Sequence, residues 1–189
     1  MTPLEAVAAV LVLVNVALVA RRSLWNYPIG LAAVTLYAII FFRSRLYSDA
    51  LLQIFFFIVQ LYGWWNWAAS KGESGAVVVE RLGARTRVGW AGGIVAATLG
   101  WGWLAHRFTD AAYPWWDASV AMMSIAAQIL MSRRAIENWV LWIAVDIVAI
   151  GLYAAKDLWL TAAVYLVLLA ISIWGLVDWQ RAARRAASA

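Results

Sequence analysis

Five side chains able to bind an aromatic, hydrogen-bonding solute recur along one apolar segment. They are Gln53, Phe57, Gln60, Trp64 and Trp67, at steps of four, three, four and three residues. This spacing places them on one face of an α-helix. Amides hydrogen-bond polar solutes, and tryptophan rings attract cations through the ring quadrupole. Because polar groups inside a membrane segment are costly, such a face is expected to line a cavity or another helix.

A second segment carries an acid in the middle of an apolar run. Asp146 lies in ENWVLWIAVDIVAIGLYAAKD, and Asn138, Trp142 and Tyr153 share its helical face. A buried carboxylate must be paired, neutralised or functional. Three roles therefore stay open for Asp146: balancing a cationic substrate, carrying a proton, or capping a neighbouring helix.

Three further side chains are candidates for the same cavity, namely Asn66, Gln128 and Tyr165. For any single amide the simpler alternative is a helix-to-helix hydrogen bond, worth about 1 kcal/mol or less. The recurrence of amides and aromatic rings over four or five segments favours a cavity. We therefore expect all of these residues to contribute to a substrate site.

The composition predicts an integral membrane protein. Hydrophobic residues make up 66% of the 189 and charged residues only 13%, about half the charged share of a soluble domain. The chain lacks cysteine and has one histidine, His106, so we expect no disulfide, no metal site and no cofactor. No phosphate-binding glycine loop or nucleophile–base pair is evident, which argues against an enzyme. The net charge of +5 comes from bases between apolar spans, so nucleic-acid binding is not expected.

Seven apolar stretches are long enough to cross a bilayer. They are residues 3–20, 25–42, 47–67, 88–105, 114–131, 139–155 and 159–179. We expect residues 1–67 to form one three-helix unit and 106–180 a second, joined by a polar loop at 68–87 and a linking helix at 88–105. A basic tail, 181–189, follows.

The bases predict an orientation. With seven spans, 11 of the 15 Lys and Arg residues fall on the side of the C-terminus and four on the other. Cytoplasmic loops carry the excess of bases, so the C-terminus is expected in the cytoplasm and the N-terminus outside. Many tryptophans, including Trp25, Trp159 and Trp179, lie at predicted span ends and suggest an interfacial belt.

The two three-helix units resemble each other at a constant offset of 112 residues. Asn26-Tyr27 falls on Asn138-Trp139, Gly63 on Gly175, and Trp67 on Trp179. Three spans reverse the chain direction, so the linking helix restores it. The fold class expected is therefore an all-α membrane protein with seven helices in a parallel 3+1+3 repeat, of the kind found in transporters.

Several motifs resemble the PnuC family of vitamin transporters. They are WNYPIG from Trp25, LYSDALLQIFF from Leu46, YGWWNW from Tyr62, ENWVLWIAVD from Glu137 and GLVDW from Gly175. The resemblance runs from the second span to the seventh. It implies a SWEET-like architecture, a bacterial inner-membrane location and a homotrimer.

The same resemblance implies a function. Members of the family import nicotinamide riboside by facilitated diffusion, and a cytosolic kinase traps the substrate by phosphorylation. Carried over to this chain, the pocket residues implied are Gln53, Trp64, Asn66, Trp67, Asn138, Trp142, Asp146 and Tyr153.

The substrate stays open at this stage because relatives carry other vitamins. Nicotinamide riboside combines a cationic ring, an amide and hydroxyls, which suit tryptophan faces, Gln and Asn partners and the carboxylate of Asp146. Thiamine is also a ring cation. Riboflavin is larger and uncharged and fits less well. A membrane subunit without a substrate of its own is the remaining alternative.

Overall fold

The computed structural model describes residues 3–43, 47–71, 77–110 and 112–187, and these form seven α-helices. The helices are α1 (Pro3–Ala20), α2 (Asn26–Arg43), α3 (Tyr47–Ala69), α4 (Ala84–Phe108), α5 (Pro114–Ser132), α6 (Glu137–Ala155) and α7 (Trp159–Ala187). Apolar segments in a bilayer must satisfy their backbone groups internally, which favours helices. The predicted all-α fold with seven helices is confirmed.

Two helices are longer than the apolar stretches that predicted them. α4 begins at Ala84 rather than at residue 88, and α7 continues to Ala187 rather than ending near residue 179. The added residues are mostly alanine and arginine, which favour helices although they are not apolar as a group. A prediction based on hydropathy alone therefore stops too early.

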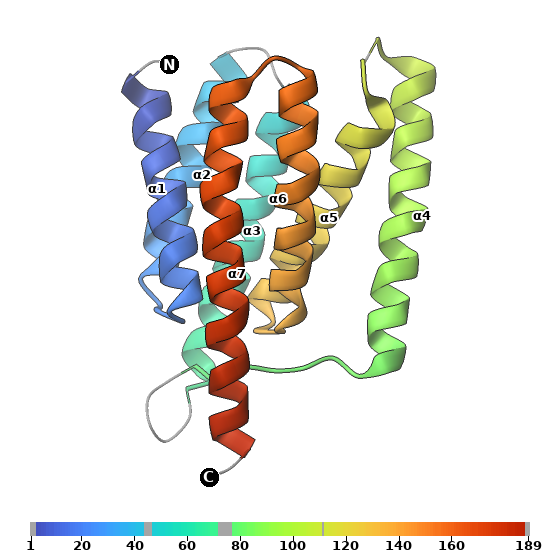
Figure 1. Ribbon diagram of the computed structural model, residues 1–189. Coiled ribbons are helices and arrows are strands. Elements are labelled where there is room, and N and C mark those ends of the chain that lie inside the picture. Colours follow the sequence, from blue (N-terminus) through green and yellow to red (C-terminus); the bar gives the residue numbers. More distant parts are fainter. Residues whose placement is uncertain (1–2, 44–46, 72–76, 111, 188–189) are drawn as a thin grey trace.

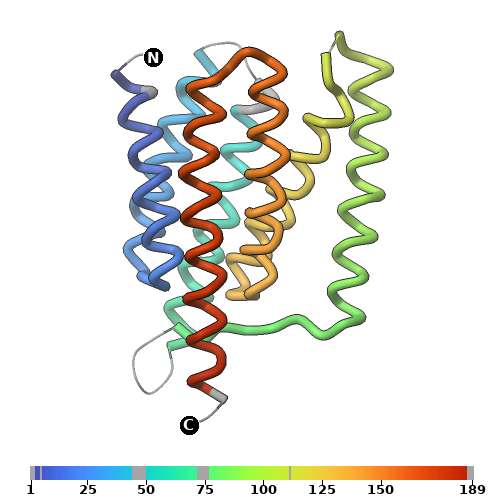
Figure 2. The backbone as a smooth tube through the Cα atoms, viewed as in Figure 1, coloured from blue at the N-terminus to red at the C-terminus, as the bar shows by residue number. Residues whose placement is uncertain are grey.

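Six of the helices form a closed ring. Neighbours pack in the order α1, α2, α3, α5, α6, α7 and back to α1, whereas α4 packs against α5, its one contact partner among the described helices. Figures 1 and 2 show the helices lying roughly parallel, with α4 standing at one side. We call α1–α3 the first half and α5–α7 the second half. The two halves meet where α1 contacts α7 and where α3 contacts α5.

Both ends of the bundle are defined by the chain termini. The N-terminus lies at one end, which we call the N-terminal end, and α7 finishes at the opposite, C-terminal end (Figure 1). The α1–α2 turn, the α5–α6 turn and residues 77–83 of the linker before α4 also lie at the C-terminal end (Figure 2). These connections therefore lie together at one end of the bundle.

Three helices end in the same kind of turn. Arg22, Arg134 and Asp157 have φ values of 55°, 60° and 56°, in the left-handed region that commonly follows a helix. In each case the amide of the following residue donates to the carbonyl five residues earlier; for example, the distance from Ser23 N to Leu18 O is 3.0 Å and that from Ala135 N to Leu130 O is 3.0 Å. These bonds stop α1, α5 and α6 and reverse the chain.

By length and apolar composition, four of the helices could cross a membrane: α2, α4, α6 and α7. α1 contributes a shorter apolar helix, from Ala6 to Ala20. The helices that fall short include α3, which carries the amides of Gln53, Gln60 and Asn66. Polar residues in a ring of this kind are expected to face its interior rather than lipid.

The largest buried side chains gather at the C-terminal end. Trp67, Trp139, Trp179 and Tyr27 are each 0% exposed and belong to one core cluster. Tyr27 meets Trp67 edge-on at 5.4 Å between ring centroids, and Trp139 meets Trp179 edge-on at 5.7 Å. Edge-to-face aromatic pairs stabilise such a core beyond their area. The expectation that Trp179 lies in an interfacial belt is wrong, whereas Trp25 is 71% exposed.

Contacts in this cluster recur at the offset seen in the sequence. Trp67 Nε1 donates to the carbonyl of Met131 at 3.0 Å, and Trp179 Nε1 donates to the carbonyl of Val19 at 3.2 Å. Both donor and acceptor are shifted by 112 residues between the two bonds. Each half therefore hydrogen-bonds the other through an equivalent indole.

The asparagines before Tyr27 and Trp139 behave alike as well. Asn26 Nδ2 donates to the carbonyl of Ser23 at 2.7 Å, and Asn138 Nδ2 donates to the carbonyl of Ala135 at 2.6 Å. Both bonds close the first turn of a helix, α2 in one half and α6 in the other. The sequence similarity thus has a local structural counterpart at these positions.

Candidate functional site

A carboxylate lies inside the ring. Asp146, on α6, is 2% exposed, and Ser172, on α7, is also 2% exposed. The hydroxyl of Ser172 donates to Asp146 Oδ2 at 2.9 Å. Among the described residues, Asp146 forms no ion pair. A single hydroxyl compensates a buried negative charge only in part, so this carboxylate can stabilise a cation brought next to it.

Two tyrosines extend this site. Tyr153 of α6 and Tyr165 of α7 stack at 5.3 Å between ring centroids, with 27° between their planes. Tyr153 is seven residues from Asp146 on one face of α6, and Tyr165 is seven residues from Ser172 on one face of α7. The tyrosine stack and the Ser172–Asp146 bond therefore lie along the same contact between α6 and α7. The predicted residues Asp146, Tyr153 and Tyr165 are therefore brought together.

A second polar group lies on the first half. Gln60 of α3 is 6% exposed, and its side chain approaches Gly30 of α2 together with the amide of Asn15 from α1. A Cβ built on Gly30 would lie 2.6 Å from Asn15 Nδ2. Because Gly30 has no side chain, the amides of Asn15 and Gln60 fit between α1, α2 and α3. Asn15 Nδ2 in turn donates to the carbonyl of Asn26 at 2.5 Å.

Several buried polar atoms have no hydrogen-bond partner within the described protein. They are Asn26 Oδ1, Gln60 Oε1, Asn138 Oδ1, Tyr27 Oη and Trp139 Nε1. Buried polar atoms are normally paired, with protein, water or a ligand. Three of the five are amide oxygens that accept hydrogen bonds. Tyr27 and Trp139 belong to the core cluster, whereas Gln60 Oε1 lies beside Gly30 and Asn15 and can accept a hydrogen bond from a hydroxyl or amide of a bound solute.

Three predicted site residues use their side chains for hydrogen bonds to backbone carbonyls of the protein. Trp67 donates to Met131 and is fully buried in the core cluster. Asn66 Nδ2 donates to the carbonyl of Ser132 at 2.9 Å, at the C-terminal end. Asn138 Nδ2 donates to the carbonyl of Ala135, at the start of α6. Trp67 and Asn66 thus join α3 to α5, Asn138 bonds within its own turn, and the role of all three in binding stays a prediction.

The remaining predicted residues are partly exposed, except Gln128, which is buried. Trp64 is 39% exposed and stacks on Tyr27 at 6.2 Å between centroids, with 5° between the planes. Phe57 is 37% exposed. Gln53 is half-buried, and Trp142 is half-buried against the core cluster. Gln128 of α5 is 6% exposed. No contact yet assigns these side chains to one site, so their role also stays a prediction.

Two residues of this interior were missing from the predicted site, Asn15 and Ser172. Asn15 is a lone amide in the apolar run LVLVNVALV, and Ser172 is the 112-residue counterpart of Gln60. The sequence signal that could have identified both residues is a single polar residue within an apolar helix. Both were hard to rank because serine and asparagine also make simple helix-to-helix bonds.

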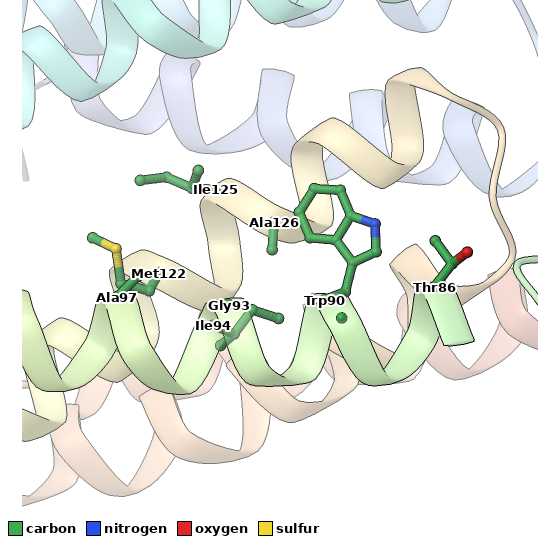
Figure 3. A pocket seen from close by; sticks show the side chains of 9 residues that line it. Thr86, Trp90, Gly93, Ile94, Ala97, Met122, Ile125 and Ala126 are labelled. Atoms are coloured by element: carbon green, nitrogen blue, oxygen red, sulfur yellow. The ribbon is translucent and has the colours of Figure 1, made fainter. Parts of the chain in front are cut away.

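An apolar groove outside the ring contains none of these residues. It has a volume of about 490 Å³ and lies between α4 and α5. Figure 3 shows Trp90 of α4 extending toward Ala126 of α5, with Met122 and Ile125 nearby. Because its lining is largely apolar, this groove lacks the groups needed to orient a polar solute. The candidate site is therefore the interior of the ring.

The chemistry available in the interior is binding rather than bond making. It offers a carboxylate, hydroxyls, amide oxygens and aromatic rings. Within the described part of the chain, no group of three or more His, Cys, Asp or Glu residues could hold a metal ion. The arrangement suits a ring-bearing solute with a positive charge and several hydrogen-bond donors.

Comparison with known proteins bears on this reading. The sequence model of a family described as nicotinamide mononucleotide transporter matches residues 2–181. The chain is 29% identical to the nicotinamide riboside transporter PnuC of Escherichia coli (strain K12), over 98% of this chain and 88% of that protein. It is 30% identical to the riboflavin/roseoflavin transporter RibM of Streptomyces davaonensis, over 96% of this chain and 86% of that protein.

A solved structure has the same fold. The crystal structure of the vitamin B3 transporter PnuC matches with a TM-score of 0.79 and 30% sequence identity. The match covers 96% of this chain and 82% of that one. The arrangement of the ring and of α4 is therefore similar to that of a known vitamin transporter.

Proposed function

Because this chain belongs to the nicotinamide mononucleotide transporter family, we propose that it carries nicotinamide riboside across the bacterial inner membrane. The family match confirms the resemblance drawn from the motifs. Relatives named as nicotinamide riboside transporters include those of Escherichia coli and Neisseria mucosa, at 29% and 30% identity. We propose the same substrate, nicotinamide riboside, for this chain.

The observation that carries the proposal is the buried Asp146. Its carboxylate, 2% exposed, has the Ser172 hydroxyl as a hydrogen-bond partner and no basic partner among the described residues. An uncompensated charge in this environment is costly, and the pyridinium ring of nicotinamide riboside carries the complementary positive charge. Tyr153 and Tyr165 supply aromatic faces beside it. The unpaired oxygen of Gln60 suits the donors of the amide or ribose.

The transport cycle proposed is alternating access between two arrangements of the halves. The recurring indole contacts support a parallel 3+1+3 repeat, in which the halves rock about a site between them. In the arrangement described here the C-terminal end is filled by the core cluster. The excess of bases supports a cytoplasmic location for that end.

Further parts of the proposal follow from the family resemblance and from the lack of an evident energy source. Movement is by facilitated diffusion, and a cytosolic kinase traps the substrate. The protein acts as a homotrimer. Uptake into proteoliposomes should therefore stop at equal concentrations on both sides unless a kinase and ATP are enclosed. Accumulation driven by a pH gradient alone would contradict this part and would favour Asp146 as a proton carrier.

Riboflavin is a second candidate because the RibM relative is as similar to this chain as the nicotinamide riboside transporters. Thiamine is a third because it too is a ring cation. The deciding experiment titrates the purified protein with each vitamin and follows its tryptophan fluorescence. Saturable quenching by nicotinamide riboside at the lowest concentration supports the proposal. Quenching by riboflavin or thiamine at much lower concentration would overturn it.

A further inference from the structure

Two arginines hold equivalent places in the two halves. Arg22 follows α1 and Arg134 follows α5, both with positive φ. Arg22 Nη1 lies 3.4 Å from the carbonyl oxygen of Asp178, and Arg134 Nη1 lies 3.2 Å from the carbonyl oxygen of Asn66. Each arginine thus reaches from its own turn to a helix of the other half, α7 for Arg22 and α3 for Arg134. The four residues are related by the same offset of 112.

The two arrangements differ in one side chain. Asp178 pairs with Arg22 through its carboxylate, with Nη1 to Oδ2 at 3.2 Å. Asn66, at the equivalent position, is neutral and donates its amide to the carbonyl of Ser132. The first arginine therefore has an acid from the other half, whereas the second has none at that position. Arg134 is also the more buried of the two, with 12% of its side chain exposed against 22% for Arg22.

The missing acid comes from the linker between α3 and α4. Glu80 forms a short ion pair with Arg134 through Nη2. Its backbone fits beside the α5–α6 turn: Glu80 N donates to Arg134 O at 2.9 Å, and Ile136 N donates to Glu80 O at 2.9 Å. A pair of backbone bonds to one turn fixes where this carboxylate lies. Glu80 is therefore placed by the fold next to Arg134.

The same linker also contacts the first half. Val78 N donates to the carbonyl of Ser70, just after α3, at 3.4 Å. Val77 is 6% exposed and belongs to the core cluster with Trp67 and Trp179. The Glu80–Arg134 pair therefore joins the end of α3 to the α5–α6 turn, across the boundary between the halves. The Arg22–Asp178 pair joins the α1–α2 turn to α7 across the other boundary.

We propose that Glu80 is a positioning residue of the transport cycle, supplying to Arg134 the carboxylate that Asp178 supplies to Arg22, so that both boundaries are held closed at the C-terminal end. This inference rests on the proposed function because it assumes that this end opens during transport. Opening then requires both ion pairs to separate. The linker is accordingly part of the closing contact and not merely a connection to α4.

The test measures opening without any substrate. The chain has no cysteine, so Ser132→Cys places one thiol at a position that is 1% exposed beside the closing contact. The rate at which a maleimide labels this thiol in the purified full-length protein reports how often the end opens. Adding Glu80→Gln should raise the rate about threefold, since losing an ion pair whose acid is 55% exposed shifts the closed state by that order.

A negative charge can then be introduced at position 66, the counterpart of Asp178 in the other half. Adding Asn66→Asp to the Glu80→Gln protein should restore slow labelling, although the bond from Asn66 to the Ser132 carbonyl is lost. Asp178→Asn should raise labelling as Glu80→Gln does, and the two together should raise it furthest. Asp110→Asn, an exposed acid at the opposite end, is the matched control and should change nothing.

Two results would overturn the inference. One is unchanged labelling in a Glu80→Gln protein that keeps the parent's elution profile and melting temperature. The other is faster labelling that Asn66→Asp fails to reverse, since the linker would then act by packing and not by charge. Failure of the proposed function is seen separately: the parent would not bind nicotinamide riboside, yet the labelling rates would still report the contact.

Discussion

The indole rings of Trp67 and Trp179 lie 5.6 Å apart between centroids, and each donates its N–H to a carbonyl in the opposite half of the chain. Neither ring is exposed. Two helices that end the two halves are thus joined by a pair of equivalent bonds. Trp179, expected at the membrane interface, and Trp67, expected in the substrate site, together close one end of the bundle.

The indole bonds should contribute measurably to stability. Trp179→Phe removes the donor to the Val19 carbonyl while keeping an aromatic ring. We expect a loss of about 0.5–1.5 kcal/mol, the net contribution of one hydrogen bond, because the Val19 carbonyl keeps its bond from Arg22 N at 2.9 Å. Thermal unfolding in detergent, followed by circular dichroism, measures it. Trp65→Phe, at a position 69% exposed, is the control, and an equal loss there would show that the bond is not the cause.

Asp146→Asn should weaken the binding of a cationic vitamin. The substitution keeps the side-chain shape and an oxygen that can accept the hydrogen bond from Ser172, but it removes the negative charge. The dissociation constant for nicotinamide riboside is expected to rise roughly tenfold to a hundredfold, as for the loss of a bond to a charged group. Fluorescence titration measures the change. Binding of the uncharged vitamin riboflavin, if present at all, should not weaken in parallel.

Gln60 allows binding to be separated from folding. Its Oε1 is buried and has no partner in the described protein, so Gln60→Leu removes an unpaired acceptor. Such a change is expected to leave thermal stability unchanged or slightly higher. Affinity for nicotinamide riboside should fall about fivefold or more, since a hydrogen bond to the solute is lost. A stable variant with parental affinity would remove Gln60 from the site.

Gly175 should not tolerate a methyl group. A Cβ there would lie 2.5–2.7 Å from three ring atoms of Trp139, which is fully buried and cannot move aside. Gly175→Ala is therefore expected to destabilise the protein by about 1–3 kcal/mol. Gly92→Ala is the matched control, because nothing lies within 4 Å of a Cβ at that position on α4. Alanine there should be neutral or stabilising by up to about 1 kcal/mol, and thermal unfolding compares the two.

Much of the fold could be predicted from the order of residues. Apolar length identified seven helices, and the offset between Tyr27 and Trp139, or between Gly63 and Gly175, identified equivalent positions. These signals are strong because a bilayer leaves a chain few alternatives to the helix. Helix ends were less predictable: α7 runs on through an alanine- and arginine-rich segment to Ala187, which hydropathy does not recognise.

The candidate site was predictable only in outline. The acid of Asp146 and the aromatic residues Tyr153 and Tyr165 stood out within one or two segments and do meet in the interior. Asn66 and Trp67 lie in the same motif as Trp64 and on the same helix as Gln60, yet their side chains bond to α5 at the end of the bundle. Helical spacing states which face a residue is on, but not what that face meets along its length.

By itself, the sequence determined that this chain is an all-helical membrane protein of two related halves with polar faces. The tertiary structure alone decided that α4 stands outside a six-helix ring and that Trp67 and Trp179 bond across it. It also decided that Arg134 takes its acid from Glu80 in the linker. The reason is physical: hydropathy and helix periodicity act within a segment, whereas these contacts depend on which segments pack together and at what depth.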